Sequence, residues 1–253
     1  MTHLERGIEK FDPTTTYLLP INRQMLLVYL PQGGAVAEVG VAEGDFSRQI
    51  LEHCQPGKLE LIDLWAYQDD AEYRRDLNNV ADPAQQHRFE AVKARFAAES
   101  ARGQVEIHRS DSVAAANTFA DGSFDFVYID GNHTYRGVKN DLEAYYPKVK
   151  TDGFICGHDF SNHESAVELG FEVVGAVFDF CRERGCLLCA ITTNEDFLSF
   201  VIAKHPGEHV NLFLMKLLYT LPGIVEVKNF LDRTFEHKLF RFSDNRQNLI
   251  VSV

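Results

Sequence analysis

The pattern of apolar and polar residues alternates between short apolar runs and amphipathic stretches, and this alternation predicts an α/β fold. The apolar runs predict buried strands at 35–39, 58–63, 104–108, 123–130, 153–156, 187–192 and 197–203. Amphipathic stretches follow the first five runs, for example at 45–54, 134–147 and 174–185. Strands that alternate with helices build a parallel sheet with helices on both faces. The turn-rich residues 193–196 join the last two of the seven strands, which predicts a C-terminal antiparallel hairpin.

The segments outside this alternation divide the chain into three parts, 1–34, 35–204 and 205–253. The first is expected to be an N-terminal helical cap of one or two helices, because the apolar stretch 22–30 is followed by Pro31. It would cover the ligand-binding edge of the sheet or a partner subunit. The last is a C-terminal extension with a helical stretch, for which a dimer contact is the leading hypothesis.

Two internal segments are less regular. Residues 69–102 are charged and helical in pattern, which predicts an exposed helix and a break near Pro83. A second helix would follow, with Phe89, Val92 and Phe96 turned inward. Residues 160–171 show no clear element and are predicted to form a mobile lid.

Length and charge narrow the class of protein. A chain of 253 residues, 45% of them hydrophobic, suits one large α/β domain with appendages. A formal net charge of −12 argues against a nucleic-acid backbone as partner. No run of about 18 apolar residues is present, so no membrane span is expected. The start of the chain lacks the hydrophobic core of a signal peptide, which favours a cytoplasmic location.

The five cysteines do not suggest a disulfide framework, since their number is odd and the chain is long. Cys181, Cys186 and Cys189 have the spacing C-x4-C-x2-C, which matches part of an iron–sulfur pattern. Cys186 and Cys189, however, lie at an odd separation in a predicted strand, which places them on opposite faces. Buried free thiols are therefore the favoured interpretation.

The first predicted strand leads into the pattern Glu38-x-Gly40-x-x-x-Gly44. Gly40 allows a sharp turn and a close approach to a ligand, and Gly44 allows the next helix to begin nearby. The spacing differs from the G-x-G-x-x-G of dinucleotide-binding proteins. A carboxylate at Glu38 suits a cationic ligand that carries an amino-acid group better than it suits a pyrophosphate. A plain structural turn is the alternative.

Further polar residues follow other strands, at the sheet edge where open α/β proteins bind ligands. Asp63 ends the second strand, where a carboxylate can accept hydrogen bonds from both hydroxyls of a ribose. Trp65 either lies against an adenine or anchors the core. Asp111 and Ser112 open a short helix, as an N-cap, as an adenine contact, or both. Asp130 ends the fourth strand, so three acid-bearing strand ends are expected to converge.

These patterns resemble known enzymes. The glycine spacing resembles motif I of class I S-adenosylmethionine (SAM) methyltransferases. The stretches VYIDGNHTYRGVKNDLEAYYP and GFICGHDF are similar to the Methyltransf_24 group, which lies near macrolide sugar O-methyltransferases and cephalosporin hydroxylase-like proteins. The resemblance covers about 35–203. It implies a Rossmann-like sheet, SAM as cofactor, and methyl transfer to a small molecule.

The resemblance also implies a divalent metal, held by Asp130 after strand four and by His158 and Asp159 after strand five. Such a metal would bind two substrate oxygens and lower the pKa of the hydroxyl to be methylated. Relatives use oxygen ligands alone. An imidazole at His158 suits manganese, iron or zinc better than magnesium. The alternative is that no metal binds and that His158 is hydrogen-bonded to a backbone group.

His133 is the best candidate for a general base, since an unperturbed imidazole titrates near neutral pH. Some relatives have a carboxylate at the position of Asn132, which cannot take a proton here. His133 could instead cap the following helix. His163 in the predicted lid is a weaker candidate for the base.

Three functions were compared on these grounds. A SAM-dependent methyltransferase that acts on an oxygen of a small-molecule acceptor is the preferred hypothesis, with no nucleic-acid or membrane partner and with a homodimer as an option. An NAD(P)-dependent oxidoreductase on a similar sheet is disfavoured by the glycine spacing and by the terminal hairpin. A non-catalytic module that keeps the SAM fold for binding is the remaining alternative.

Overall fold

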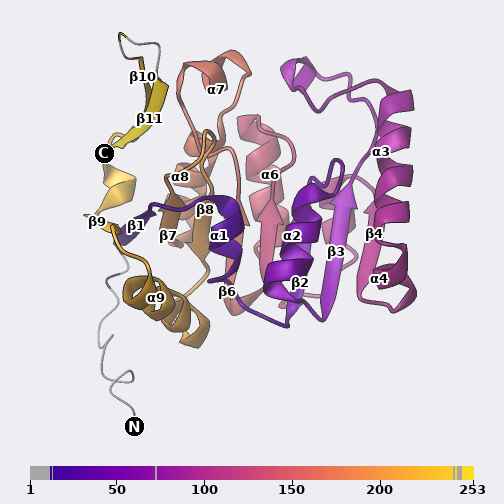
Figure 1. The fold of residues 1–253 in the computed structure, drawn as a ribbon, viewed down its shortest axis with the longest axis horizontal. Coiled ribbons are helices and arrows are strands. Elements are labelled where there is room, and N and C mark those ends of the chain that lie inside the picture. Colours follow the sequence, from indigo (N-terminus) through magenta and orange to yellow (C-terminus); the bar gives the residue numbers. More distant parts are fainter. Residues whose placement is uncertain (1–11, 13, 72, 242, 244–246) are drawn as a thin grey trace.

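A large sheet between two layers of helices forms the body of the protein in a computed structural model, which describes residues 12, 14–71, 73–241, 243 and 247–253 (Figure 1). The strands of this sheet are β1 (Thr15–Leu19), β2 (Ala35–Val39), β3 (Lys58–Asp63), β4 (Val105–Arg109), β5 (Phe124–Ile129), β6 (Val149–Gly157), β7 (Leu187–Thr192), β8 (Phe200–Ala203) and β9 (Val225–Lys228). Their spatial order is β4-β3-β2-β5-β6-β8-β7-β1-β9. A separate antiparallel hairpin consists of β10 (Glu236–Arg241) and β11 (Gln247–Ser252).

The predicted α/β class and the seven predicted strands are confirmed as β2 to β8. Strands β2 to β6 are mutually parallel, and β8 lies antiparallel between β6 and β7. The predicted antiparallel hairpin is therefore present as β7 and β8, with β8 next to the parallel strand β6. The seven predicted strands do not complete the sheet, because β1 and β9 extend it beyond β7.

The N-terminal segment was predicted to contain only helices, and this is wrong at Thr15–Leu19. These residues are β-branched, aromatic or aliphatic, which favours a strand. They form β1, which pairs in parallel with β7 through contacts such as Tyr17 with Ala190. The helix α1 (Arg23–Leu27) follows, with Asn22 as its N-cap. The rest of the predicted cap, 1–11 and 13, lies outside the described residues.

The helices cover both faces of the sheet. One core cluster joins the sheet to α5 (Ser112–Ala116), α6 (Tyr135–Tyr145) and α8 (Val173–Arg184). The other joins it to α1, α2 (Asp45–Cys54), α3 (Asp82–Arg95) and α9 (Glu208–Thr220). Cys181 and Cys186 lie in the first cluster and Cys189 in the second, all as free thiols, so the predicted placement of Cys186 and Cys189 on opposite faces is confirmed.

Two irregular segments differ from expectation. Among the described residues of 69–81, a single 3₁₀ turn, Tyr73–Arg75, stands in place of the predicted exposed helix. Pro83 lies in the first turn of α3, where a proline needs no amide hydrogen, so it begins a helix instead of breaking one. The predicted lid contains a short helix, α7 (Glu164–Glu168). Val92 and Phe96 are buried, as predicted, and α4 (Ala97–Ala101) follows.

Among the helices of the described ranges, none is both long and apolar enough to cross a lipid bilayer.

If β1 is an integral strand, a cavity within it should destabilise the whole domain. Leu19 is 0% exposed, and its replacement by alanine should lower the free energy of unfolding by about 2–5 kcal/mol in a single transition. Val28→Ala is the control, because Val28 is 47% exposed. Urea unfolding followed by circular dichroism measures both. A separate early transition in Leu19→Ala would contradict an integral β1.

Candidate functional site

The carboxyl ends of the parallel strands, which point toward the upper edge in Figure 1, border a cavity of about 390 Å³. Five residues that the sequence singled out line it, namely Gly40, Asp63, Asp111, Ser112 and Asp130. They come from the ends of β2, β3, β4 and β5, so the predicted convergence of strand ends is confirmed. Of the other cofactor candidates, Glu38, Gly44 and Trp65 lie outside the cavity wall.

The turn after β2 touches the end of β5 through its backbone. Gly40 has φ +87°, and a Cβ atom there would lie 2.0 Å from the carbonyl oxygen of Asp130. Gly44, the N-cap of α2, has φ +77° and would place a Cβ 2.8 Å from Phe96. Both positions require glycine, on grounds of conformation and of space.

Asp63 organises the same turn. One carboxylate oxygen accepts the amide hydrogens of Val41 and Ala42 at 3.0 and 2.9 Å, and the other accepts that of Trp65 at 2.8 Å. Ala42 and Trp65 have φ +48° and +42°, in the left-handed region that non-glycine residues seldom occupy. Burial nevertheless raises the pKa of Asp63, and these amide bonds oppose the rise. A carboxylate has about four acceptor sites, so Asp63 keeps acceptor capacity toward the cavity.

Trp65 is 1% exposed and belongs to the core. Its indole nitrogen donates to the carbonyl oxygen of Ala42 at 2.9 Å, and its ring packs 5.1 Å from that of Phe89. This position matches the alternative of a core anchor. Trp65 does not line the cavity, and an adenine contact through its ring stays a prediction.

Glu38 lies buried beneath the glycine turn, 1% exposed. Burial raises its pKa to about 8, and the nearby Ser47 side chain only partly opposes this effect. Its Oε2 atom is buried and has no hydrogen-bond partner among the described residues. A buried acceptor of this kind costs free energy unless a donor reaches it.

Asp111 and Ser112 connect the cavity to the helices behind it. Asp111 caps α5 by accepting the amide hydrogen of Ala114 at 2.9 Å, so the predicted N-cap is confirmed. Ser112 donates to Asp141 at 2.5 Å. Burial raises the pKa of Asp141, a cavity residue that the sequence reasoning missed, to about 7. Asp141 lies in the stretch VYIDGNHTYRGVKNDLEAYYP that carries the family resemblance, but the sequence analysis assigns it no role.

Next to the cavity, acids and histidines from two loops form a compact cluster. Asp130, His133 and Asp159 each offer one ligand atom, and these atoms lie within 4.8 Å of one another. Nε2 of His133 is 2.9 Å from Asp159 and 3.6 Å from Asp130. That nitrogen is buried, and its close contact with Asp159 is an ion pair without good hydrogen-bond geometry. Asp159 itself has φ +56°, a strained conformation of the kind that gathers at functional sites.

His158 stands at the edge of this cluster. Its Nδ1 atom is 3.3 Å from Asp159 and 3.8 Å from Asp130, and its Nε2 atom is 3.8 Å from Glu195. The structure therefore places the predicted ligands Asp130, His158 and Asp159 together. It also brings in His133, which the sequence had assigned to general base catalysis alone.

Three further residues of the cluster had no signal in the sequence. Asp76 lies 2.6 Å from Nδ1 of His133, and Arg23 lies 2.8 Å from Asp130. Glu195 accepts the backbone amide hydrogen of Arg23 at 3.1 Å. These residues come from a 3₁₀ turn, from α1 and from the β7–β8 turn, segments in which no motif marked them.

Electrostatics alter the interpretation of His133. Burial alone lowers its pKa, but Asp159, Asp130 and Asp76 raise it well above the ordinary value. The premise of an unperturbed imidazole is therefore wrong for the chain without a bound cation. The pKa of His158 rises to about 9, because Asp130 and Asp159 outweigh burial. The pKa of Asp159 is lowered, since two histidines outweigh its burial.

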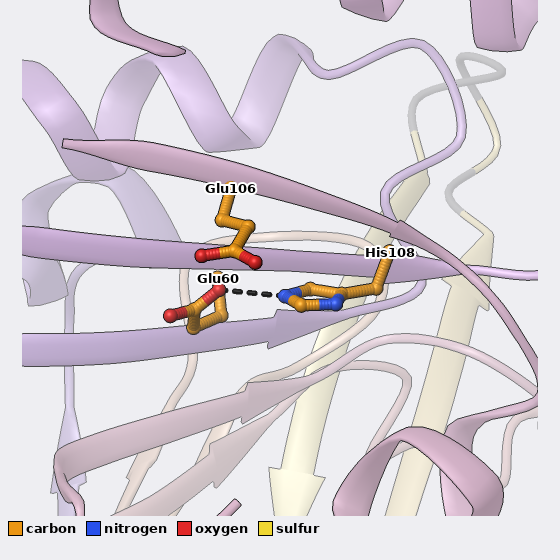
Figure 2. A group of neighbouring side chains, drawn as sticks. All are labelled: Glu60, Glu106 and His108. Atoms are coloured by element: carbon orange, nitrogen blue, oxygen red, sulfur yellow. Dashed lines mark hydrogen bonds and ion pairs between the residues drawn. The ribbon is translucent and has the colours of Figure 1, made fainter. Parts of the chain in front are cut away.

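A second group of ligating side chains, Glu60, Glu106 and His108, lies on β3 and β4 (Figure 2). Glu60 and His108 point toward one another and pair at 2.7 Å. Lys58 lies 2.7 Å from Glu106 and 3.6 Å from Glu60. A cation of the chain thus already balances these acids, which is the arrangement of an ordinary surface network.

Comparison with protein families gives a match to the cavity and the cluster together. Residues 37–160 match the family described as a methyltransferase domain, and this range contains β2 to β6 and nearly all residues of the site. The chain contains a methyltransferase domain. A comparison with curated proteins gives no match.

Solved structures share the fold of this methyltransferase. A candidate sarcosine dimethylglycine methyltransferase from Galdieria sulphuraria matches with TM-score 0.50 and 9% identity, over 71% of this chain and 81% of that chain. The B. subtilis M1A22 tRNA methyltransferase TrmK matches with TM-score 0.50 and 12% identity, over 76% and 68%. An O-methyltransferase family protein from Burkholderia thailandensis matches with TM-score 0.50 and 13% identity, over 73% and 56%. At these identities the likeness concerns the fold alone.

The buried Glu38 makes a testable contribution to the pH dependence of stability. The pKa of Glu38 is about 8 in the folded chain, whereas the ordinary value for a glutamate in an unfolded chain is 4.5. Between these two pH values, only the native state keeps the proton. This contribution is present below pH 4.5 and is lost as the pH rises through 8. Glu38→Gln should therefore gain stability relative to the unsubstituted chain between pH 5 and 8, by up to about 1.4 kcal/mol per pH unit.

Urea unfolding of both chains at several pH values measures this difference. Glu43→Gln, which changes an exposed carboxylate of the same turn, is the control. A difference between Glu38→Gln and the unsubstituted chain that does not change with pH would show that Glu38 is ionised in the fold.

Proposed function

We propose that the protein is a SAM-dependent methyltransferase that methylates an oxygen of a small molecule. The observation that carries the proposal is the arrangement of two features side by side. A cavity with a glycine turn and strand-end acids adjoins a buried cluster of acids and histidines, and Asp130 belongs to both. The first feature suits a nucleoside cofactor with a cationic amino-acid portion, and the second suits activation of a hydroxyl.

Each part of the cavity has a role in this proposal. Asp63 would accept hydrogen bonds from the ribose hydroxyls with the acceptor capacity that its backbone bonds leave. Asp111 and Ser112 would border the adenine at the start of α5. Glu38 is too deeply buried for a broad contact, and its part is to support the Gly40 turn, where the amino-acid portion of SAM would lie.

The cluster also fits a divalent cation. Nε2 of His133 is buried between carboxylate oxygens of Asp159 and Asp130, at 2.9 and 3.6 Å, so that the three ligand atoms face one another. We propose that Asp130, Asp159 and His158 hold the cation, with His133 as a further ligand. Two carboxylates and imidazole nitrogens suit manganese, iron or zinc better than magnesium. When bound, such a cation lowers the pKa of the acceptor hydroxyl.

The residues around the cluster hold its geometry. Asp76 binds Nδ1 of His133, so that Nε2 faces Asp130 and Asp159, an arrangement that resembles the carboxylate–histidine pairs behind metal ligands. Arg23 stacks 4.6 Å from the ring of Phe46 and fixes one oxygen of Asp130. Methyl transfer is an in-line displacement at the sulfonium, so the contribution of these residues is to orient the acceptor and to receive its proton.

The cofactor assignment can be tested with the demethylated product, S-adenosylhomocysteine. Calorimetry should show that this ligand binds and that NAD does not. Asp63→Asn should weaken binding tenfold to a hundredfold, because a hydrogen bond to a charged group contributes about 1.5–3 kcal/mol. Asp45→Asn, at an exposed acid in the next helix, should leave the affinity unchanged. Tight binding of NAD without binding of S-adenosylhomocysteine would overturn the proposed function.

The metal assignment has a readout apart from activity. Calorimetric titration of the chelator-treated chain should detect Mn²⁺ binding, and Asp130→Asn should weaken it by at least about tenfold, as losses at metal sites commonly do. Affinity for S-adenosylhomocysteine should change much less, because Asp130 would contact metal and acceptor. Asp121→Asn, at an exposed acid that pairs with Lys148, is the control.

Methyl transfer should also fall with chelator and return better with manganese than with magnesium. Full activity in chelator, together with no binding of manganese, iron or zinc, would exclude the metal and leave the methyltransferase proposal standing. In that case His133→Ala should remove most of the rate, typically about 10²–10⁴-fold for a general base.

A further inference from the structure

A second cavity, of about 370 Å³, adjoins the acid–histidine cluster. Glu195 is the link, because it lines this cavity and its carboxylate lies 3.8 Å from Nε2 of His158. Asp130 provides the corresponding link on the side of the first cavity. The cluster is thus flanked by two cavities, and only one of them has the glycine turn and strand-end acids of a nucleoside site.

The wall of the second cavity is built largely outside the family match at 37–160. The β7–β8 turn contributes Glu195, Asp196 and Phe197. The hairpin of β10 and β11, called the C-terminal hairpin below, contributes Leu239 and Leu249. Leu239 and Leu249 are direct register partners in β10 and β11, so their side chains share one face of the hairpin. In Figure 1 this hairpin stands beside α7 at the same edge of the molecule as the carboxyl ends of the strands.

The hairpin is fixed to the loop that carries the cluster. Asn162, three residues after Asp159, donates to the carbonyl oxygen of Phe235 and accepts the amide hydrogen of His237. The rings of Phe160 and Phe235 pack 5.0 Å apart. The second cavity is therefore a built feature, because the same loop positions both the cluster and the hairpin.

His163 fixes the other wall and is not free for catalysis. Its Nδ1 atom accepts the amide hydrogen of Ala166 at 3.3 Å, and its Nε2 atom lies 3.0 Å from the carbonyl oxygen of Asp196. Both ring nitrogens are thus used to join α7 to the β7–β8 turn. His163, the weaker of the two general-base candidates from the sequence, therefore has a positioning role in this geometry.

The chemistry of the wall defines the ligand that fits. Glu195 and Asp196 bring two carboxylates, and no lysine or arginine lies in the part of the wall that the structure describes. Thr193 and Asn194 offer hydrogen bonds, while Phe197 and the two leucines offer an apolar surface. Such a wall suits a hydroxylated ring compound that is neutral or cationic, and it disfavours an anion. The volume is in the range of small-molecule sites.

We propose that the second cavity is the acceptor site of the methyltransferase, that the C-terminal hairpin forms its outer wall, and that it selects neutral or cationic hydroxylated rings over anionic ones. The inference rests on the proposed function, since an acceptor site has meaning only beside a cofactor site. It assigns a role to the part of 205–253 for which the sequence offered only a dimer contact.

Three phenols that differ mainly in charge serve as probes: tyramine, 4-ethylphenol and 4-hydroxyphenylacetate. None of them chelates metals, so binding can be measured by saturation-transfer NMR titration with or without a cation. Salt should be raised to screen the net charge of −12. The unsubstituted chain should bind tyramine best and 4-hydroxyphenylacetate worst. Equal affinity for all three would overturn the proposed charge selection.

Leu239→Trp and Phe240→Trp form a matched pair. The first fills the cavity, whereas Phe240 follows it in β10, is 46% exposed and faces the other way. Leu239→Trp should weaken 4-ethylphenol binding by at least about tenfold, the effect of roughly 1.4 kcal/mol, and Phe240→Trp should have little effect. Equal affinities in the two variants would overturn the assignment of the cavity.

Asp196→Lys provides a test that does not depend on packing, since Asp196 is exposed in a turn. It should reduce or reverse the preference for tyramine over 4-hydroxyphenylacetate, and an unchanged preference would count against the assignment. Binding of S-adenosylhomocysteine is measured in parallel on each variant. Cofactor binding without cavity-dependent phenol binding defeats the acceptor site alone. Cavity-dependent phenol binding without cofactor binding defeats the proposed function, and the cavity is then a ligand site that is not an acceptor site.

Discussion

The crowding of carboxylates at one edge of the sheet is the constraint on which the rest of this site depends. Acids that share a low-dielectric region repel one another and lose hydration, so each needs compensation. Asp63 obtains it from three backbone amides. Glu38 and Asp141 have pKa values raised to about 8 and about 7, so they can lose their charge by holding a proton. Asp130 and Asp159 obtain compensation from histidines and an arginine. In the proposed function, an external cation would take the place of some partners of this last group.

Most of the sheet and much of the first cavity could be predicted from the sequence, because both depend on local patterns. A buried strand that ends in a glycine or an acid leaves a signature within a few residues, as at Gly40 and Asp63. The cluster partners Asp76 and Glu195 leave none, because they reach His133 and His158 across 57 and 37 positions of the chain. Their roles follow from tertiary contacts that neither periodicity nor a short motif encodes.

Strand β1 was missed for a related reason. Its five residues form too short a run to separate strand from loop, and it gains stability only by pairing with β7, far along the chain. The pairing has a consequence for the site. Because β1 lies beside β7, the helix that follows it delivers Arg23 to Asp130 and its backbone amide to Glu195. The N-terminal segment thus contributes Arg23 to the acid–histidine cluster, although its predicted all-helical structure is wrong at β1.

In the two proposals, the first cavity binds the cofactor and the second binds the acceptor, a division that the family match alone does not reveal. In the proposed function, the range 37–160 supplies the cofactor side and most of the acids of the site. The hairpin and the β7–β8 turn supply the other side, where acceptors differ. Asn162 and Phe160 join that wall to the Asp159 loop. A substitution in the hairpin that changes acceptor specificity is therefore expected to shift the residues of the cluster as well. Acceptor choice and hydroxyl activation are therefore expected to vary together.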